Sequence, residues 1–159
     1  MMSLFSNLFA RAPILSEASP HDAGAIATLH GQSFRRGWTE QEIEGLLLDR
    51  HVVAHRAASG SKLCGFILSR LVEDEAEILS VAVARAAQGR GLARKLLDLH
   101  LRRLAGLGAR TVFLEVDQHN RPAIKLYDRA GFREISRRPN YYPAAGGDTA
   151  AALVLRRDL

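Results

Sequence analysis

Cysteine and long hydrophobic runs are scarce in this chain of 159 residues. Cys64 is the only cysteine, so an internal disulfide and a disulfide-stapled scaffold are excluded. No apolar stretch approaches the roughly 20 residues that a membrane-spanning helix needs. Five prolines and 13 glycines are too few for a collagen-like or low-complexity chain. We therefore expect a soluble, cytoplasmic protein without a membrane partner, in which Cys64 is a small buried hydrophobe.

The residues that are present describe one globular domain of basic character. Hydrophobic residues make up 47% of the chain and charged residues 25%, which is enough to bury a substantial core. The net charge is +5, and most of the 22 basic residues are arginines. Arginine suits phosphate binding, so the charge favours an anionic ligand, although a general coding bias toward arginine gives the same excess. We expect a frayed N-terminal extension over residues 1–11 and one domain over residues 12–159.

Hydrophobic periodicity and turn signals predict an α/β domain with a mixed, mostly antiparallel sheet flanked by helices. Short polar turns between the strands in the middle of the chain imply antiparallel neighbours. Ser19 and Thr39 are the expected N-caps of the first two helices. The element order is β-α-α-β-β-β-α-β-α-β-β. The expected strands cover residues 14–18, 51–57, 62–72, 76–83, 111–116, 132–138 and 149–155, and the helices begin near residues 19, 39, 92 and 122.

A glycine-containing turn, residues 88–93, joins a strand to the longest helix. A helix N-terminus presents unpaired backbone N–H groups, and small residues let a phosphate approach them. The spacing matches neither a Walker loop nor the G-x-G-x-x-G of dinucleotide folds. Alone, the turn therefore indicates either a pyrophosphate site or a tight structural turn. Its small residues and neighbouring arginines are Gly89, Gly91, Ala93, Arg90 and Arg94.

This turn resembles the acetyl-coenzyme A pyrophosphate loop of the GNAT superfamily of N-acetyltransferases. A second landmark, residues 113–132, is similar to that superfamily's succession of strand, Asn, short helix, Tyr and Gly-Phe. The resemblance narrows to the ribosomal-protein-alanine N-acetyltransferases on Leu114–Val116 and Arg137–Pro143. It covers most of the chain and implies the GNAT fold with acetyl-CoA as cosubstrate. An inserted Pro139, and Asp117 where the family often has Arg, depart from the pattern.

Two side chains are candidates for the acid–base chemistry of acetyl transfer. Strand alternation puts Glu115 on the face opposite Leu114 and Val116, so its carboxylate can point into a cleft. The resemblance implies that Glu115 is the general base, acting through water, and that Tyr127 protonates the departing thiolate. From the residues alone, the alternatives are a solvated or salt-bridged carboxylate and a packing tyrosine.

The resemblance also implies which residues hold acetyl-CoA. Backbone groups of the strand before the turn would pair with the pantetheine arm like an added strand. Asn120 would bond that arm, cap the following helix, or do both. The six histidines show no metal-ligand spacing, so we expect no metal. The expected cofactor-binding residues are Val81, Ala82, Val83, Gln88, Gly89, Arg90, Gly91, Leu92, Ala93, Arg94 and Asn120.

An N-terminal amine is the expected acceptor. Its reference pKa is about 7.7–8.0, against about 10.4 for lysine, so a modest base neutralises it more easily. The family implies the N-terminal alanine of ribosomal small-subunit protein number eighteen, which attacks directly in a ternary complex. We expect a monomer or weak dimer and no stable nucleic-acid binding. The acidic turn Glu73–Glu75 either attracts a basic acceptor chain or is a solvated hairpin turn.

Other acceptors and another class of protein stay open. On the same fold, the acceptor can be a lysine side chain, a small amine or an aminoacyl-tRNA, the last favoured by the net charge. The alternative class is a module that binds coenzyme A or nucleic acid without catalysis. Glu115 and Tyr127 argue against that class, because binding alone needs neither.

Overall fold

The computed structural model of the chain describes residues 11–143 and 149–159. Most of the expected N-terminal extension, residues 1–10, lies outside the described residues. The expected order of helices and strands is confirmed, with two added turns of 3-10 helix at Pro20–Asp22 and Arg85–Ala87. The strands are β1 (Ile14–Glu17), β2 (Val52–Ser59), β3 (Lys62–Val72), β4 (Glu75–Val83), β5 (Thr111–Asp117), β6 (Arg133–Pro143) and β7 (Thr149–Asp158). The α-helices are α2 (Ala23–Ser33), α3 (Glu40–Leu48), α4 (Leu92–Gly106) and α5 (Arg121–Arg129).

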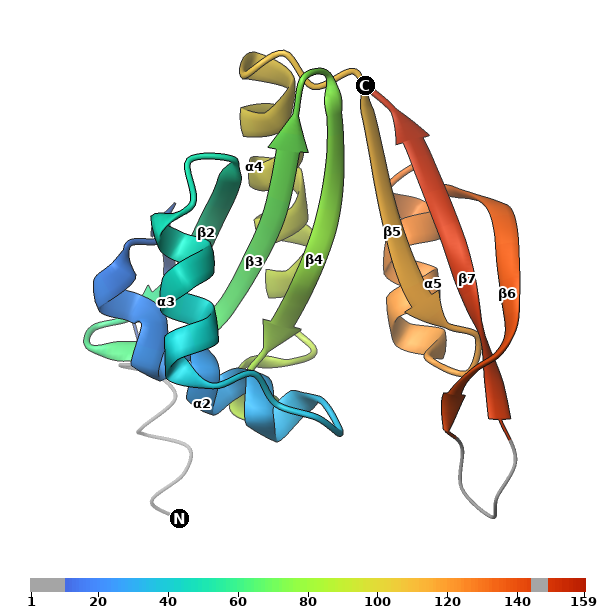
Figure 1. Cartoon of the computed structure of the whole chain (residues 1–159). Coiled ribbons are helices and arrows are strands. Elements are labelled where there is room, and N and C mark those ends of the chain that lie inside the picture. Colours follow the sequence, from blue (N-terminus) through green and yellow to red (C-terminus); the bar gives the residue numbers. More distant parts are fainter. Residues whose placement is uncertain (1–10, 144–148) are drawn as a thin grey trace.

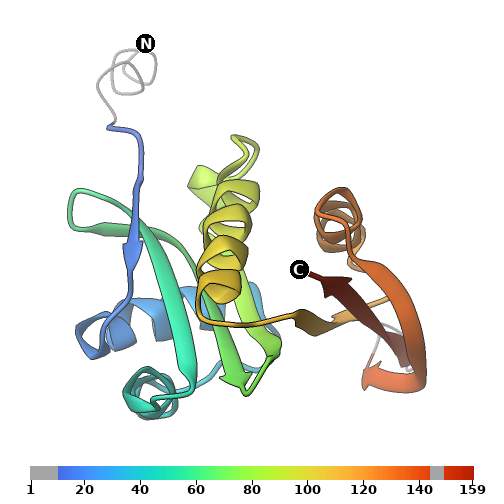
Figure 2. The ribbon, with the colours of Figure 1, turned by 90° about the horizontal axis from the view of Figure 1, so that it is seen from above.

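The seven strands form one sheet in the order β1-β2-β3-β4-β5-β7-β6. Only β4 and β5 pair in parallel, and the other neighbours are antiparallel. Helices α4 and α5 cover one face of the sheet, and α2 and α3 lie on the other (Figure 2). Each face has its own hydrophobic cluster, one built around the leucines of α4 and the other around Ile26 and Ile43. The mixed sheet flanked by helices is therefore as expected from the sequence.

The sheet opens between β4 and β5. These strands pair over only four positions, from Glu75 with Thr111 to Ile78 with Leu114. Beyond that point they diverge, so the sheet splays into two arms (Figure 1). A β-bulge in β4 marks the place, because Ser69 of β3 pairs with Ile78. Its neighbour in β3, Leu68, pairs with a residue two positions further along β4, which leaves Leu79 as the extra residue. Side chains of β4 after the bulge therefore point to the face opposite to the one that strict alternation along the strand predicts.

Local signals explain how the helices begin. Thr39 and Glu42 form the expected capping box, since Thr39 Oγ1 accepts from the Glu42 N–H at 3.1 Å and the Glu42 carboxylate accepts from the Thr39 N–H at 2.8 Å. The start of the first helix differs from the prediction. Pro20–Asp22 form a 3-10 turn, and the α-helix begins only at Ala23. Ser19 is the N-cap of this turn, as predicted, and it forms a capping box with Asp22, whose carboxylate accepts from the Ser19 N–H at 2.8 Å.

The last two strands are longer than predicted. Strand β6 continues beyond Arg138 to Pro143, and β7 continues to Asp158. The register between β6 and β7 shifts between Arg138 and Tyr142. Asn140 takes a positive φ of 57°, which is tolerated best by glycine, asparagine and aspartate. This bulge accommodates Pro139 and lets the pairing resume, where the sequence signal suggested that the strand ends.

Candidate active site

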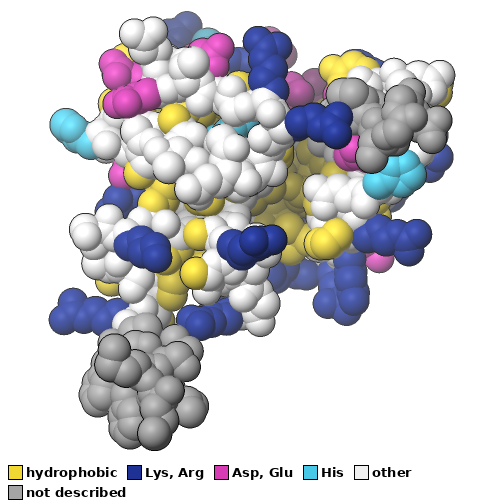
Figure 3. All heavy atoms as spheres, turned by 90° about the horizontal axis from the view of Figure 1, so that it is seen from below, with side chains coloured by type: hydrophobic (Ala, Val, Ile, Leu, Met, Phe, Trp, Pro, Cys, Tyr) yellow, Lys and Arg dark blue, Asp and Glu magenta, His cyan; other side chains and the backbone are white. Residues whose placement is uncertain are grey.

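A large pocket occupies the gap, lined mostly by the end of β4, the turn before α4, and α5, and also by the C-terminal end of α2. We call it the helix-side pocket; its volume is about 1140 Å³. Seen from the open end of the gap, the two arms enclose a hollow with hydrophobic side chains inside and Lys and Arg side chains around it (Figure 3). All the expected cofactor-binding residues except Arg90 line this pocket. They are Val81, Ala82, Val83, Gln88, Gly89, Gly91, Leu92, Ala93, Arg94 and Asn120.

The glycine turn at the start of α4 gives the pocket an open rim of backbone. Gly89 and Gly91 have positive φ values of 79° and 75°, and no atom lies within 4 Å of where a Cβ would stand on either residue. Gly91 is the N-cap of α4. The Gln88 side chain donates to the Val83 carbonyl at 3.0 Å, which fixes the turn to the end of β4. The first N–H groups of α4 therefore face a space that a phosphate can enter.

Tyr127 of α5 lies at the wall of the helix-side pocket. It is 4% exposed and meets the ring of Phe132 edge-on, with ring centroids 5.5 Å apart. Burial raises the pKa of the Tyr127 hydroxyl above its usual range, because the phenolate would lose its hydration. The hydroxyl therefore carries its proton at neutral pH and can donate it.

Asn120 caps helix α5. Its side-chain oxygen accepts from the Ala123 N–H at 3.3 Å. The capping alternative is thus confirmed, and the contact with a pantetheine arm stays a prediction. Asn120 also lines the helix-side pocket.

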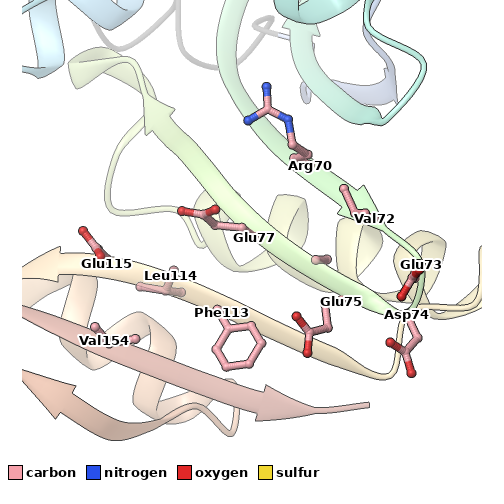
Figure 4. Close-up of a pocket in the computed structure, with 11 residues that line it drawn as sticks. Arg70, Val72, Glu73, Asp74, Glu75, Glu77, Phe113, Leu114, Glu115 and Val154 are labelled. Atoms are coloured by element: carbon pink, nitrogen blue, oxygen red, sulfur yellow. The ribbon is translucent and has the colours of Figure 1, made fainter.

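A second cavity lies on the α2 and α3 face of the sheet, along the paired part of β4 and β5. We call it the acidic groove; it has a volume of about 500 Å³ (Figure 4). Glu115 lines it, on the face opposite the buried Leu114, as strand alternation predicts. The Glu115 side chain is 27% exposed, and its Oε1 lies 3.2 Å from an amino group of Arg138 on β6. The groove is acidic because four further carboxylates line it, those of Glu73, Asp74, Glu75 and Glu77.

The structure separates the two expected catalytic side chains between the two cavities. Tyr127 belongs to the helix-side pocket and Glu115 to the acidic groove. The acidic groove lies on the α2 and α3 face of the sheet, whereas the helix-side pocket extends through the gap, since Leu29 and Phe34 from the α2 side line it together with α4 and α5. The two strands diverge directly after Leu114. A ligand that enters the gap between β4 and β5 can therefore be reached from both faces.

Sequence reasoning missed the aromatic rim formed by the segment between α2 and α3. Phe34 lines the helix-side pocket and is 39% exposed. The buried ring of His30 lies between Phe34 and Trp38, with ring centroids 4.4 Å and 4.5 Å away. Nδ1 of His30 accepts from the Trp38 N–H at 3.1 Å, and burial lowers the pKa of His30. The sequence signal that could have indicated this rim is the succession of His30, Phe34 and Trp38 directly before the capping box at Thr39.

Glu77 and Arg138 were missed as well. Glu77 projects from β4 into the groove that Glu115 lines (Figure 4). Its place one strand away from Glu115 follows from the parallel register, in which Glu77 is opposite Phe113. Arg138 reaches Glu115 from β6, across β7. Neither neighbour can be deduced without the order of the strands.

Comparison with known proteins identifies the family. The family model described as the acetyltransferase (GNAT) family matches residues 23–132, more than half of the chain. The chain belongs to this GNAT family. A ribosomal protein bS18-alanine N-acetyltransferase of Salmonella typhimurium is 35% identical over 140 residues, which are 88% of this chain and 94% of that protein. The family resemblance is therefore confirmed.

Solved GNAT structures share the fold. The ribosomal-protein-S18-alanine N-acetyltransferase of Escherichia coli superposes with a TM-score of 0.85 and 27% identity, over 92% of this chain and 93% of that one. NAA60 of Arabidopsis thaliana, solved in complex with acetyl-CoA, gives a TM-score of 0.82 at 21% identity, over 92% of this chain and 98% of that one. The second likeness shows the fold alone.

Two further findings concern membranes and metals. No helix in the described ranges is long and apolar enough to cross a membrane. Within residues 11–143 and 149–159, no three His, Cys, Asp or Glu side chains gather in a group able to hold a metal ion.

Proposed function

We propose that this protein transfers an acetyl group from acetyl-CoA to the N-terminal α-amine of a protein, with the N-terminal alanine of ribosomal protein bS18 as acceptor. The choice of bS18 as the acceptor rests on the 35% identity to the Salmonella bS18-alanine N-acetyltransferase, over 94% of that protein. Family membership and the splayed sheet support the acetyl transfer itself. We expect the enzyme to act in the cytoplasm, as a monomer or weak dimer, with residues 12–159 as its catalytic domain.

The helix-side pocket is the proposed site of acetyl-CoA. Pyrophosphate oxygens accept from the N–H groups of the turn and of the first turn of α4, where Gly89 and Gly91 leave the backbone open. Arg94 lines this pocket and adds positive charge, and Arg90 adds charge from outside the lining. Pantetheine adds to the free edge of β4 at Val81–Val83, beyond the four positions that β5 occupies.

Acetyl transfer then needs proton transfers at the amine and at the departing thiolate. Glu115 takes the proton that the acceptor ammonium loses, by way of a water, and the neutral amine attacks the thioester carbonyl directly in a ternary complex. A backbone N–H of the β4 edge binds the carbonyl oxygen as negative charge develops on it. As the C–S bond breaks, Tyr127 donates its proton to the departing thiolate, and the tyrosinate takes up the second proton that the nitrogen loses on becoming an amide. The place of Tyr127 at the wall of the helix-side pocket supports this role, and its raised pKa keeps the hydroxyl protonated before the thiolate forms.

Acetyl-CoA-dependent mass gain on synthetic peptides tests the proposal. One peptide carries the free N-terminal alanine of bS18, a second is blocked at its N-terminus but contains lysine, and a third reaction contains no peptide. We expect only the free-alanine peptide to gain an acetyl group. We also expect Tyr127→Phe to lower the rate by about 10²-fold or more while coenzyme A still binds.

Other results point to other functions. Acetylation of the blocked peptide alone would replace the proposal with lysine acetylation. If neither peptide reacts while coenzyme A binds, small amines and aminoacyl-tRNA become the acceptors to test. Binding without turnover on any of these acceptors would indicate the non-catalytic module.

A further inference from the structure

The hydroxyl of Ser80 in β4 is buried without a partner. Ser80 is 7% exposed, and within residues 11–143 and 149–159 its Oγ is the one buried side-chain nitrogen or oxygen that bonds no other protein group. Buried polar groups in proteins are almost always hydrogen-bonded, because an unpaired group gives up its hydration for nothing. An exception of this kind beside an active site is a candidate for contact with water or substrate.

The β-bulge decides which face Ser80 points to. Ser80 pairs with Leu68, and Ser69 pairs with Ile78, so the bulge residue Leu79 lies between. Side chains of paired residues point to the same face of a sheet. Leu68 belongs to the hydrophobic cluster of α2 and α3, whereas Ile78 belongs to the cluster of α4. Ser80 therefore points to the α2 and α3 face.

Glu115 points to the same face from the other side of the gap. Leu114, the last residue of β5 that pairs with β4, is buried in the cluster of α4. Glu115 follows it, so strand alternation turns its side chain to the opposite face. Ser80 and Glu115 thus share one face, on the two strands that border the gap, and each lies within two residues of the last β4–β5 pair.

Ser80 also lies between the two cavities along β4. Glu77 lines the acidic groove, and Val81 lines the helix-side pocket. Along β4, Ser80 therefore lies between the residues that line the two cavities, although its own side chain lines neither. A hydroxyl accepts and donates hydrogen bonds, and so can hold a water in a fixed orientation.

We propose that Ser80 is a positioning residue that holds the water through which Glu115 deprotonates the acceptor amine. The proposal rests on the function proposed above. The water gives a proton to the Glu115 carboxylate and takes one from the acceptor ammonium, leaving a neutral amine, a carboxylic acid and the same water. Ser80 keeps its own proton throughout. Its hydroxyl fixes where the water stands, and Arg138, bonded to Oε1 of Glu115, fixes the carboxylate.

Removing the hydroxyl should change the melting temperature differently for a serine that acts on substrate and for a serine that stabilises the fold. Because Oγ of Ser80 bonds no protein group, Ser80→Ala removes a buried polar group at no loss of contacts. The melting temperature of Ser80→Ala should therefore stay level or rise by a few degrees, while the turnover falls. Ser69 is the matched control, since it is a buried serine on the adjacent strand whose Oγ is bonded to His100 at 2.6 Å. Ser69→Ala should lower the melting temperature.

Steady-state kinetics with the free-alanine peptide and acetyl-CoA, together with thermal melts, test the proposal. For Ser80→Ala we expect kcat to fall roughly ten-fold, with the KM for acetyl-CoA unchanged. Ser80→Thr keeps the hydroxyl and should restore most of the rate. Full activity of Ser80→Ala would overturn the proposal. So would a melting temperature lowered as far as in Ser69→Ala, because the serine would then be structural.

A crystal structure of the wild-type protein with coenzyme A separates this proposal from the proposed function. We expect an ordered water within hydrogen-bond distance of Ser80 Oγ and the Glu115 carboxylate. If the wild-type protein acetylates no peptide, the proposed acceptor is wrong. The presence or absence of this water in the crystal still tests whether Ser80 and Glu115 hold a water between them. A direct bond between Ser80 and a protein group in that crystal would overturn the proposal.

Discussion

The two cavities at the gap between β4 and β5 are chemically opposite. The helix-side pocket is bordered by a buried tyrosine, open glycine backbone and the N-terminus of α4. The acidic groove is bordered by five carboxylates, among them Glu115, and by Phe113. Successive parts of β4 build the two cavities, since Glu75–Glu77 line the groove beside β5 and Val81–Val83 line the pocket beyond the β4–β5 pairing. An anionic donor and a cationic acceptor can therefore approach one reaction centre from two sides without sharing a binding surface.

The short pairing of β4 with β5 makes this division possible. Strands β3 and β4 pair from Gly65 with Val83 to Val72 with Glu75, whereas β4 and β5 pair at four positions only. The bulge at Leu79 ends that pairing and also turns Ser80 toward the groove face. The bulge therefore lies where the sheet opens and also sets the orientation of Ser80 beside the opening. Variants confined to one face should separate the two cavities experimentally.

The largest effect is expected from Glu115→Gln. The amide keeps the size of the side chain but cannot take a proton, so kcat/KM for the acceptor peptide should fall by about 10²–10⁴-fold. Binding of coenzyme A should be unchanged, because Glu115 does not line the helix-side pocket. Calorimetric titration with coenzyme A and peptide kinetics check both halves of this prediction. Glu75→Gln, at the far end of the same groove, is the control and should retain most of the rate. Weakened coenzyme A binding in Glu115→Gln would contradict the separation of the faces.

The two sides of the sheet also differ in how deeply they bury titratable groups. The acidic groove keeps its carboxylates near solvent, whereas the α4 side buries His100 completely. His100 Nδ1 lies 2.7 Å from His55 Nδ1, so one of these nitrogens must lack a proton for the bond to exist. Burial is the main cause that lowers the pKa of His100 to about 3, and the neighbouring His55 lowers it further. A second proton would place two N–H groups against each other inside the core.

Acid should therefore destabilise the α4 side. The folded pKa of His100 lies below its unfolded value of about 6.5, so the unfolded state binds the proton first. Stability is complete above pH 6.5 and falls as the pH drops toward 3. At pH 5 the expected loss is about 2 kcal/mol relative to pH 7.5. Urea unfolding at both pH values measures it. In His100→Leu the difference between the two pH values should shrink, although the variant is less stable overall, whereas the exposed control His21→Gln should keep the full difference.

Much of the fold could be predicted because its signals are local. The capping box at Thr39 and the leucine spacing of α4 depend on residues within one or two turns. The glycine turn and the alternation that exposes Glu115 are local as well. These features follow from side-chain chemistry and the repeat of the element. The strand ends of β6 and β7 were less predictable, since the bulge around Asn140 depends on pairing between two strands.

The arrangement of the candidate site could not be deduced in the same way. Glu115 and Tyr127 are twelve positions apart and sit in separate cavities, which depends on the divergence of β4 from β5. The partner of Glu115, Arg138, reaches it across β7. The orientation of Ser80 depends on an extra residue in β4 that no composition or period signals. Long-range pairing therefore decides what the residues do together, while the sequence indicates which residues are available.

The smallest effect is expected from Gly91→Ala, which acts on the helix-side pocket alone. Gly91 has a φ of 75°, and a Cβ there would meet no atom within 4 Å, so the penalty is conformational rather than steric. Alanine at such a position costs about 1 kcal/mol of folding stability. It also stiffens the rim proposed for the pyrophosphate, so the KM for acetyl-CoA should rise several-fold while the KM for the acceptor peptide stays constant.

Gly106→Ala is the control for this variant, because it lies at the other end of the same helix with equally open space around it. Gly106 has an ordinary helical backbone, so alanine there should stabilise the protein by about 0.5–1 kcal/mol and change neither KM. Thermal melts and initial rates at varied acetyl-CoA concentrations compare the two variants. If Gly91→Ala lowers the melting temperature but leaves the KM for acetyl-CoA unchanged, the turn is structural and the phosphates lie elsewhere. A parallel rise in the KM for the peptide would show instead that the two cavities are coupled through β4, which contradicts their separation.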